Sequence, residues 1–472
     1  MVKNFKEDVE RIRALEEAQR AIGKDDPYYP AFHLAPPVGW LNDPNGLCQM
    51  GDVHHIFFQY SPQWKKGGQY WGHYETKDFI NYDCTGAFLA PDSNEDRSGV
   101  YSGSALLEDG VMYLYYTGNV KEEGDYDYIY EGRGANVILV ESKDGRVASK
   151  KQVLLTNGDY PKNLSCHVRD PKVWKGKDGY FMVLGARTKD DKGCILLYRS
   201  DDKYHWEFMK FIETKERFGY MWECPDYFLL GGHSITATCP QGLKSEEYRF
   251  QNIHQSGYFT DLRVENFLEW DMGFDFYAPQ TYEDQKGRRI MIGWMGVPDA
   301  PFQEEPSMEK GWSQLLTVPR QLIYDSTQRL IRQWPIEELE QLRDGKIDLE
   351  KEALPSAYEL LLDKNHEDDL ELLFDDALLF TYHSGDKTCQ LRFLKDGYGR
   401  EVRNISLNHG IRTMRVLVDR CSIEIFINAG SYVMTSKFFY HQRENRERTL
   451  KVDGKFSEIT CLRLKEFNIK LA

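Results

Sequence analysis

Apolar positions near the start of the chain recur at helical spacing over residues 4–22. The apolar residues on one face of this helix would be Phe5, Val9, Ile12, Leu15 and Ile22. Asn4 is suited to cap the start of the helix, and Gly23 is suited to end it. We predict that residues 1–29 form a helical extension that packs against the rest of the protein. A regulatory or partner-binding helix is the alternative.

Beyond Pro30 the pattern changes to short apolar and aromatic runs between Gly, Asp, Asn and Pro turns. Such runs cover residues 53–60, 111–117, 180–184, 194–198, 227–230 and 289–294. Evenly spaced strands without intervening helices favour a closed or radial all-β architecture. No strict repeat is visible, but the segment is long enough for five units of about 60 residues. We predict a five-bladed β-propeller over residues 30–333, and the number five is inferred from size alone.

The remainder of the chain predicts a second β domain. A short helix starting at Trp334, with Pro335 near its first position and Leu339 and Leu342 on its apolar edge, would form a linker over residues 334–350. Seven further runs of alternating apolar residues follow, at 358–362, 370–374, 389–394, 413–418, 422–427, 432–439 and 458–464. Runs of this number with short turns predict a β-sandwich over residues 351–472. The predicted fold class is therefore all-β.

Composition narrows the function classes. Hydrophobic residues make up 41% of the chain and charged residues 29%, as in ordinary globular proteins. The net charge of −15 argues against nucleic-acid and anionic-membrane partners, because both attract an excess of Lys and Arg. The 14% of aromatic residues favours strands and suits a site that stacks on sugar rings.

Targeting signals and metal motifs are not evident in the sequence. The first residues contain no apolar signal-peptide core, and no apolar run has the length of a membrane span. Nine scattered cysteines without a CxxC pair argue against a disulfide framework or a zinc site. We therefore expect a cytoplasmic protein that needs no metal and no cofactor. The acidic surface gives no indication of the oligomeric state.

Three acidic motifs are candidates for chemistry. Asp43 lies in the run Trp-Leu-Asn-Asp-Pro-Asn-Gly at residues 40–46, Asp170 follows Arg169, and Glu223 lies between Trp222 and Cys224. The structural alternatives are a tight turn, a surface ion pair and a carboxylate bonded to the backbone. Apolar neighbours around Glu223 would raise its pKa, as a general acid requires.

The spacing of these carboxylates suggests how they could act together. They lie far apart in the chain, so a radial fold would place each on a different blade. Inner strands of a propeller converge on one axial pocket, and two carboxylates that face a glycosidic bond are the machinery of a glycosidase. A third carboxylate could stabilise the substrate or the transition state.

These motifs resemble glycoside hydrolase family 32, the invertase and fructan-hydrolase family. Within it the chain is most similar to the sucrose-6-phosphate hydrolase type of β-fructofuranosidase. Supporting matches in family order lie at residues 58–60, 71–73, 101–104, 273–280, 293–295, 316–320 and 419–426. The resemblance covers nearly the whole chain from His33 onward, and it implies a five-bladed propeller followed by a β-sandwich.

The resemblance also implies roles for individual residues. Asp43 would be the nucleophile, Glu223 the general acid/base and Asp170 the transition-state stabiliser. The substrate-binding residues would be Asn42, Gln59, Trp71, Tyr101, Ser102, Arg169 and Trp294. The implied reaction is hydrolysis, with retention of configuration, of the terminal β-D-fructofuranoside of sucrose or sucrose 6-phosphate, or of short fructo-oligosaccharides.

Some features depart from the family pattern and leave alternatives open. The segment 63–70 is shortened, so Trp64 is only a candidate for a tryptophan usual in this region. Lys65, Lys66, Gly67 and Gly68 could instead form a rim loop. We expect a solvated loop there, and contact of a lysine with a substrate phosphate is the alternative. A fructan hydrolase or a transfructosylase of the same fold stays possible. An inverting propeller glycosidase and a non-catalytic carbohydrate-binding propeller are the more distant alternatives.

Overall fold

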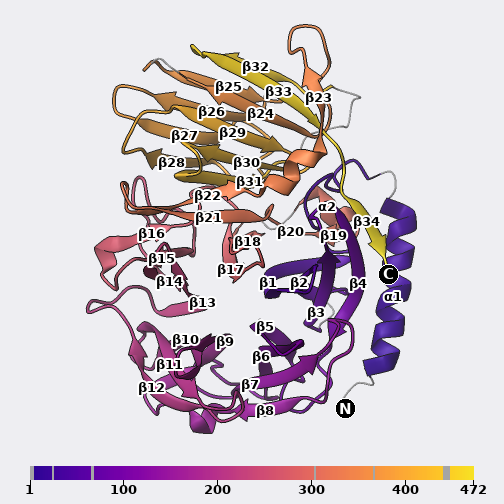
Figure 1. Ribbon diagram of the computed structural model, residues 1–472, viewed down its shortest axis with the longest axis vertical. Coiled ribbons are helices and arrows are strands. Elements are labelled where there is room, and N and C mark those ends of the chain that lie inside the picture. The colour runs from indigo at the N-terminus through magenta and orange to yellow at the C-terminus, as the bar shows by residue number, and fades with distance from the viewer. Residues whose placement is uncertain (1–4, 24–25, 65–67, 302–304, 365–366, 440–446) are drawn as a thin grey trace.

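A computed structural model describes residues 5–23, 26–64, 68–301, 305–364, 367–439 and 447–472. In these ranges five mainly antiparallel sheets surround an axis, and two further sheets form a sandwich beside them (Figure 1). The innermost strands β1, β5, β9, β13 and β17 contact one another in a closed ring. The predicted all-β class, a propeller followed by a sandwich, is confirmed.

The blades follow one another along the chain. Their strands are β1 (Gly39–Met50), β2 (Val53–Ser61), β3 (Tyr70–Thr76) and β4 (Asn81–Leu89); β5 (Gly99–Glu108), β6 (Val111–Lys121), β7 (Arg133–Ser142) and β8 (Gln152–Leu155); β9 (Leu164–Gly176), β10 (Gly179–Thr188), β11 (Gly193–Ser200) and β12 (Glu207–Ile212); β13 (Met221–Leu230), β14 (His233–Gln241), β15 (Gly257–Phe259) and β16 (Phe267–Glu269); β17 (Tyr277–Glu283), β18 (Arg289–Met295), β20 (Leu315–Leu316), β21 (Arg320–Asp325) and β22 (Leu330–Pro335).

The sandwich contains the other long run of strands. One sheet has the order β23-β33-β24-β29-β30-β31 and the other β28-β27-β26-β25-β32. Their bounds are β23 (Arg343–Ile347), β24 (Tyr358–Asp363), β25 (Leu370–Phe374), β26 (Leu378–His383), β27 (Thr388–Phe393), β28 (Val402–Ser406), β29 (Thr413–Val418), β30 (Ser422–Ile427), β31 (Tyr432–Lys437), β32 (Leu450–Asp453) and β33 (Glu458–Leu464). Each of the seven predicted runs in this part of the chain coincides with a strand.

The first blade is completed by segments from distant parts of the chain. The short strand β19 (Trp312–Ser313) pairs in parallel with β1, and the C-terminal strand β34 (Asn468–Leu471) pairs in parallel with β4. Pairings of this kind leave no local pattern in the sequence, and neither strand was predicted. The last residues of the predicted sandwich segment therefore belong to a propeller sheet.

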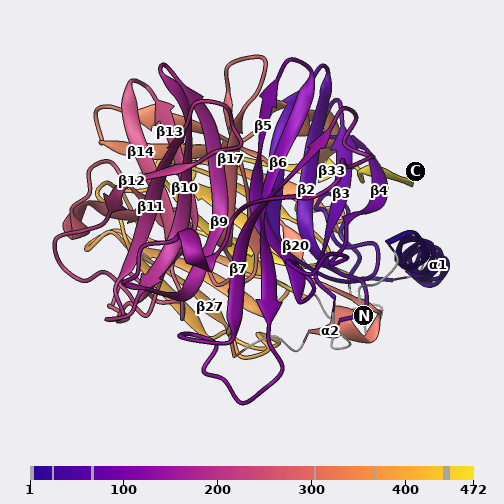
Figure 2. The same cartoon turned by 90° about the horizontal axis from the view of Figure 1, so that it is seen from below.

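The N-terminal helix α1 (Phe5–Gly23) packs beside β4 at the side of the propeller (Figure 2). The predicted helix and its packing against the body are confirmed; Asn4, the expected cap, lies outside the described residues. The most buried positions are Asp8, Ile12 and Glu16. The hydroxyl of Tyr70 donates to Asp8 and that of Tyr60 to Glu16, each at 2.9 Å. The buried face of α1 is therefore partly polar, and hydrogen bonds hold it against β2 and β3.

The predicted linker helix begins later than expected. Trp334 and Pro335 end β22, where they pair with Gln321 and Arg320 of β21. The helical turn that follows is a 3-10 segment over Glu337–Leu342, with Leu339 and Leu342 buried. The prediction of a helix start at Trp334 was wrong because the strand pairing outweighs the preference of proline for a first helical turn. The other helical segments are α2 (Pro306–Glu309), Asn157–Asp159 and Val264–Asn266.

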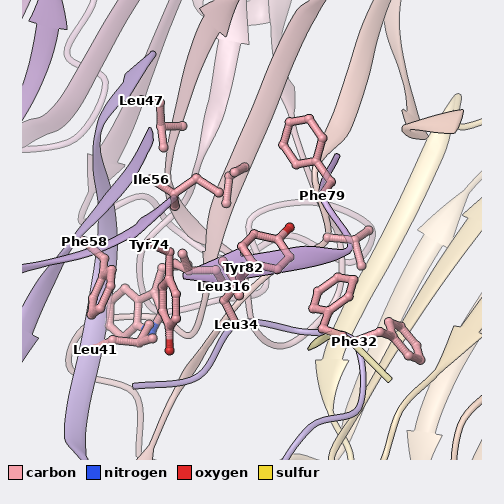
Figure 3. Packing of buried hydrophobic residues seen from close by; sticks show 14 of the residues in the cluster. Phe32, Leu34, Leu41, Leu47, Ile56, Phe58, Tyr74, Phe79, Tyr82 and Leu316 are labelled. Atoms are coloured by element: carbon pink, nitrogen blue, oxygen red, sulfur yellow. The ribbon is translucent and has the colours of Figure 1, made fainter. Parts of the chain in front are cut away.

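Aromatic side chains fill the space between the sheets. Figure 3 shows Phe58 and Tyr74 of the first blade close to Leu41, while Phe32 and Leu34 pack from the segment that precedes β1. Rings of this size bury large apolar areas and account for much of the stability of each blade. The aromatic content of the sequence is thus used mainly in the core.

Candidate active site

Each innermost strand of the propeller is interrupted by a register shift. The shifts lie between Leu41 and Pro44, Val100 and Gly103, Arg169 and Lys172, Glu223 and Asp226, and Tyr277 and Gln280. A bulge turns the side chains of its extra residues out of the regular alternation. Asp170, Cys224 and Ala278 accordingly have positive φ angles of 64°, 45° and 46°. The bulges direct the predicted site residues toward the axis.

These bulges share a sequence signal that is too degenerate to stand out as a repeat. Four of them contain a residue followed by proline: Asp43-Pro44, Asp170-Pro171, Cys224-Pro225 and Ala278-Pro279. Proline suits a bulge because it has no N–H to give to the ladder. A polar residue follows each of these prolines, and Ser104 follows the bulge that has no proline, between Val100 and Gly103. All five polar residues are buried: Asn45, Ser104, Lys172, Asp226 and Gln280. A degenerate Pro-polar repeat therefore marks the inner strands.

The three candidate carboxylates line one cavity of about 370 Å³. The other lining residues are Trp40, Asn42, Gln59, Gln69, Tyr101, Arg133, Arg169, Cys224, Tyr277, Trp294, Pro298 and Asp299. Cys224 joins the carboxylates directly: its thiol lies 3.6 Å from Asp43 Oδ2, and its backbone N–H donates to Asp170 Oδ2 at 2.9 Å. The residues predicted from separate motifs thus converge at the axis.

Asp43 is held by side chains of its own blade and of the next. Asn42 Nδ2 donates to Oδ1 at 3.1 Å, Gln59 Nε2 lies 3.4 Å from Oδ2, and the Ser102 hydroxyl donates to Oδ2. Burial raises the pKa of Asp43, while the bonds from Ser102 and Asn42 oppose that rise. The donors fix the position of the carboxylate and favour its charged form.

Asp170 is more deeply buried. Its backbone N–H donates to Thr117 Oγ1 at 2.8 Å. Burial raises the pKa of Asp170 to about 7, although the positive charge of Arg169 works in the opposite direction. A carboxyl with such a pKa changes charge near neutral pH, which is common at functional sites.

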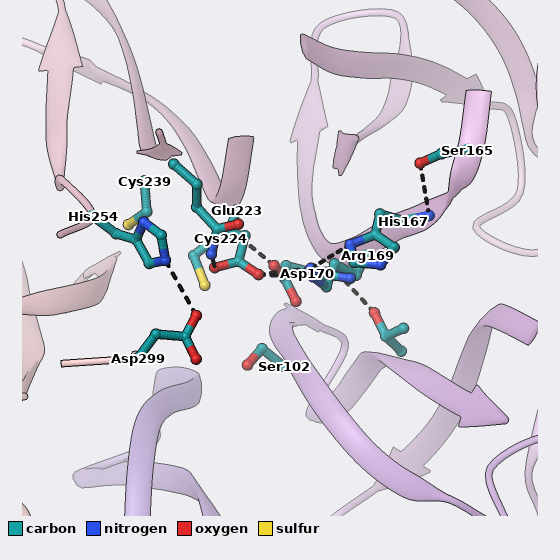
Figure 4. A network of polar contacts seen from close by, with 12 residues as sticks. Ser102, Ser165, His167, Arg169, Asp170, Glu223, Cys224, Cys239, His254 and Asp299 are labelled. Atoms are coloured by element: carbon teal, nitrogen blue, oxygen red, sulfur yellow. Dashed lines mark hydrogen bonds and ion pairs between the residues drawn. The ribbon is translucent and has the colours of Figure 1, made fainter. Parts of the chain in front are cut away.

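Glu223 does not have the apolar surroundings that the sequence suggested. Arg169 donates to Oε1 through Nε at 3.0 Å and Nη2 at 2.8 Å. Gln241 and Tyr277 donate to Oε2 at 2.8 and 2.9 Å. That expectation was wrong, because the ring of Trp222 is fully buried in a hydrophobic cluster between the third and fourth blades, so it is not free to cover the carboxylate. Figure 4 shows Glu223 beside Arg169 and Asp170 in this network.

The predicted substrate-binding residues divide into two groups. Asn42, Gln59, Tyr101, Arg169 and Trp294 line the cavity. Ser102 is fully buried behind Asp43, within hydrogen-bond distance of Gln59 Nε2.

Trp71 is the exception among these residues. Its ring is fully buried and its indole N–H donates to the carbonyl of Tyr101 at 3.0 Å. The expectation that Trp71 contacts the substrate is corrected, since the inward pleat of β3 turns it into the core; it supports the backbone of Tyr101 instead.

Several residues of the site were not predicted. Gln69 donates to both Asn42 Oδ1 and Gln59 Oε1, at 3.0 and 2.5 Å. Trp64, which the sequence offered only as a candidate for a family tryptophan, stacks on the cavity residue Trp40 with ring centroids 5.1 Å apart. The expected lysines of that loop, Lys65 and Lys66, lie outside the described residues. Glutamine and tryptophan at these positions carry no local signal of function.

One group of potential metal ligands occurs in the described ranges, and it does not line the cavity. His55 Nδ1 lies 3.1 Å from His73 Nε2, and Glu75 completes the group. Glu75 is ion-paired with Arg146, and each histidine has a hydrogen-bonded contact. These contacts indicate that the two histidines and Glu75 have a structural role.

Comparisons with known proteins agree with the geometry. Residues 33–335 match the family model described as Glycosyl hydrolases family 32 N-terminal domain, and residues 382–467 match Glycosyl hydrolases family 32 C terminal. The chain belongs to glycoside hydrolase family 32. The resemblance inferred from the motifs is confirmed.

Relatives of this family 32 chain match over nearly its whole length. The sucrose-6-phosphate hydrolase of Bacillus subtilis (strain 168) is 37% identical over 476 residues, or 94% of this chain and 96% of that protein. That of Staphylococcus xylosus is 34% identical and covers 98% of this chain and 97% of its own length.

Solved structures show the same fold. Sucrose-6-phosphate hydrolase from Lactobacillus gasseri superposes with a TM-score of 0.84 at 26% identity, over 97% of both chains. The Bombyx mori GH32 beta-fructofuranosidase has a TM-score of 0.84 at 27% identity, over 99% of this chain and 100% of that one. None of the helices in the described ranges has the length and apolar character needed to cross a bilayer.

Proposed function

We propose that this family 32 enzyme releases the terminal non-reducing β-D-fructofuranosyl group of sucrose or sucrose 6-phosphate, with retention, through a covalent fructosyl-enzyme. The observation that carries the proposal is the convergence of Asp43, Asp170 and Glu223 from three blades on one cavity. The relatives named sucrose-6-phosphate hydrolase support the choice of substrate.

In the first step Asp43 would attack the anomeric carbon C2 of the fructosyl group. Its carboxylate is already oriented by Asn42, Gln59 and Ser102, so little rearrangement is needed to reach the attacking geometry. Glu223 would donate a proton to the departing oxygen as the C2–O bond breaks. The products of this step are the free leaving-group sugar and a fructosyl ester of Asp43.

In the second step Glu223 would act as a base. It would take a proton from a water molecule, which attacks C2 and releases fructose, and Asp43 would recover its carboxylate. Asp170 and Arg169 would bind ring hydroxyls, and the negative charge of Asp170 would stabilise the positive charge that develops at C2.

The roles of the two catalytic carboxylates can be separated by substitution. Asp43→Asn should lower kcat on sucrose by about 10⁴-fold, because it removes the nucleophile. Glu223→Gln should lower kcat by about 10²- to 10⁴-fold on sucrose and much less on an aryl fructoside whose leaving group needs no proton. Steady-state kinetics with both substrates provide the measurement.

A matched control is Asp201→Asn, which changes an exposed aspartate outside the cavity and should leave kcat unaltered. Unchanged turnover in Asp43→Asn would refute the nucleophile assignment. An equal loss on both substrates in Glu223→Gln would refute its role as the acid. A proton NMR time course would report the anomer released first, and an inverted product would favour the inverting alternative, whose carboxyls lie about 6.5–9.5 Å apart.

Substrate range needs its own comparison. A fructan hydrolase would show the highest kcat/KM on inulin or long oligosaccharides, and a transfructosylase would release glucose in excess of free fructose. A non-catalytic carbohydrate-binding propeller would release neither sugar. The proposed reaction uses no metal, cofactor or nucleic-acid partner. A cytoplasmic location stays a prediction from the sequence.

A further inference from the structure

One wall of the cavity carries a guanidinium group without an acidic partner. Arg133 is the first residue of β7 and lines the cavity. Within the described part of the chain, no carboxylate forms an ion pair with it, whereas Arg169 in the same wall is paired with Glu223. The Nε atom of Arg133 is buried and has no hydrogen-bond partner. A buried donor on a charged group is costly to leave unpaired.

The polar neighbours of the Arg133 guanidinium are the His167 ring and the Tyr101 hydroxyl, and neither is a carboxylate. Arg133 Nη1 lies 2.8 Å from His167 Nε2, and Arg169 Nη2 lies 3.0 Å from His167 Nδ1. Burial and the nearby arginines lower the pKa of His167 to about 2, so the ring is neutral. A neutral imidazole has one acceptor nitrogen and can accept from only one of the two arginines. Two cations therefore compete for a single acceptor.

The position of Arg133 corresponds to the leaving-group side of the reaction. The fructosyl group would lie against Asp43 at the axis, whereas Arg133 comes from the third strand of its blade, farther from the axis. The contacts from Glu223 through Arg169 and His167 to Arg133 span no more than about 11 Å. A hexose joined through its anomeric oxygen and carrying a phosphate on C6 covers a comparable distance.

The other wall would repel an anion. Figure 4 shows His254 and Asp299 on one side of Glu223, and His167 and Arg169 on the other. Asp299 lines the cavity and its side chain is 77% exposed, so its charge faces the solvent-filled mouth. Lys121 of β6 pairs in register with Arg133 of β7 and adds to the positive potential of the wall that Arg133 forms. The charges thus define one orientation for an anionic leaving group.

We propose that Arg133 determines specificity by binding the phosphate of a 6-phosphorylated leaving-group hexose, so that sucrose 6-phosphate is preferred over sucrose. This inference rests on the proposed function and deepens it. The bidentate geometry of a guanidinium matches a phosphate, and water-excluded contacts between them are among the stronger polar interactions.

The test is the ratio of kcat/KM for sucrose 6-phosphate to that for sucrose. Wild type should favour the phosphorylated substrate, and Arg133→Met should lower the ratio by about 10- to 100-fold, mainly through KM. Arg133→Lys, which keeps the charge, should retain part of the preference. The matched control Arg199→Met alters an arginine on β11 outside the cavity and should leave the ratio unchanged.

A measurement on the wild-type enzyme tests the same inference without depending on the folding of a variant. Glucose 6-phosphate should inhibit wild type at lower concentration than glucose, and the difference should shrink at high ionic strength. A wild type without preference for the phosphorylated substrate, an unchanged ratio in Arg133→Met, or an equal fall in Arg199→Met would overturn the inference. If wild type cleaves neither substrate, the proposed function itself fails.

Discussion

At the scale of single residues, the site depends on how each carboxylate is surrounded. Cys224 is central because its backbone and thiol reach Asp170 and Asp43 at once. A hydrogen bond with Cys239 and burial raise the pKa of the Cys224 thiol well above its ordinary value, so it stays protonated and can donate. The raised pKa of Asp170, about 7, shows that folding places a carboxyl where its charge is unfavourable.

The unfavourable burial of the Asp170 charge predicts the effect of Asp170→Asn on stability. The folded protein retains a proton on Asp170 that the unfolded chain releases near pH 4, so the stability of wild type should fall as the pH rises from about 4 to 7. Asparagine has no such proton and can still accept from Cys224 N–H. At pH 8 the variant should be more stable than wild type by a few kcal/mol, with no comparable gain at pH 4, and its activity should be largely lost.

Denaturant unfolding of both proteins at pH 4 and pH 8 provides the measurement, with Asp201→Asn as the exposed control. A variant that is equally or less stable than wild type at pH 8 would contradict the prediction.

At the scale of elements, the bulges depend on the close approach of neighbouring blades. Gly185 of β10 pairs with Arg169, at the edge of the β9 bulge. A Cβ atom added at Gly185 would lie 2.2 Å from the carbonyl oxygen of Trp222 and 3.3 Å from Pro225. The third and fourth blades can therefore bring Arg169 and Glu223 together only if residue 185 has no side chain.

We expect Gly185→Ala to separate these strands and weaken the Arg169–Glu223 pair. Overpacking of this kind should cost about 1–3 kcal/mol of unfolding free energy, and kcat should fall because the acid is displaced. Gly158→Ala is the matched control, since the nearest atom to its added Cβ is 3.7 Å away. Thermal unfolding and sucrose kinetics on both variants would check this; wild-type values in Gly185→Ala would argue against it.

At the scale of the whole molecule, buried charges join the propeller to the sandwich. His33, which precedes β1, contacts Asp419 Oδ2 at 2.7 Å and Glu424 Oε1 at 2.9 Å. Arg320 of the fifth blade also pairs with Glu424, and all of these side chains are inaccessible to solvent. Lys437 of the sandwich shares the Gln314 side chain with the indole N–H of Trp294, so the interface reaches the cavity wall.

His33 makes the stability of this interface dependent on pH. Burial alone would lower its pKa, but hydrogen bonds and charge from Asp419 and Glu424 raise it to about 9. Because the folded value is above the unfolded value of about 6.5, this contribution is complete below pH 6.5 and is lost as the pH rises through 9. His33→Gln should therefore cost a few kcal/mol at pH 6 and much less at pH 9.5.

Unfolding free energies of both proteins at the two pH values would provide the check, and His409→Gln, an exposed histidine, is the control. A difference that does not change with pH would mean that His33 is neutral in the folded protein.

The sequence alone determined the all-β class, the strands at the thirteen apolar runs, the N-terminal helix, the three carboxylates and the family. These properties are encoded locally, in the alternation of apolar residues and in short motifs around Asp43, Asp170 and Glu223. The tertiary structure alone decided that Arg169, Gln241 and Tyr277 surround Glu223, that Trp71 is a core residue and that β19 and β34 complete the first blade. Those contacts join residues that are distant in the chain, so they depend on how the blades pack. No local sequence pattern predicts them.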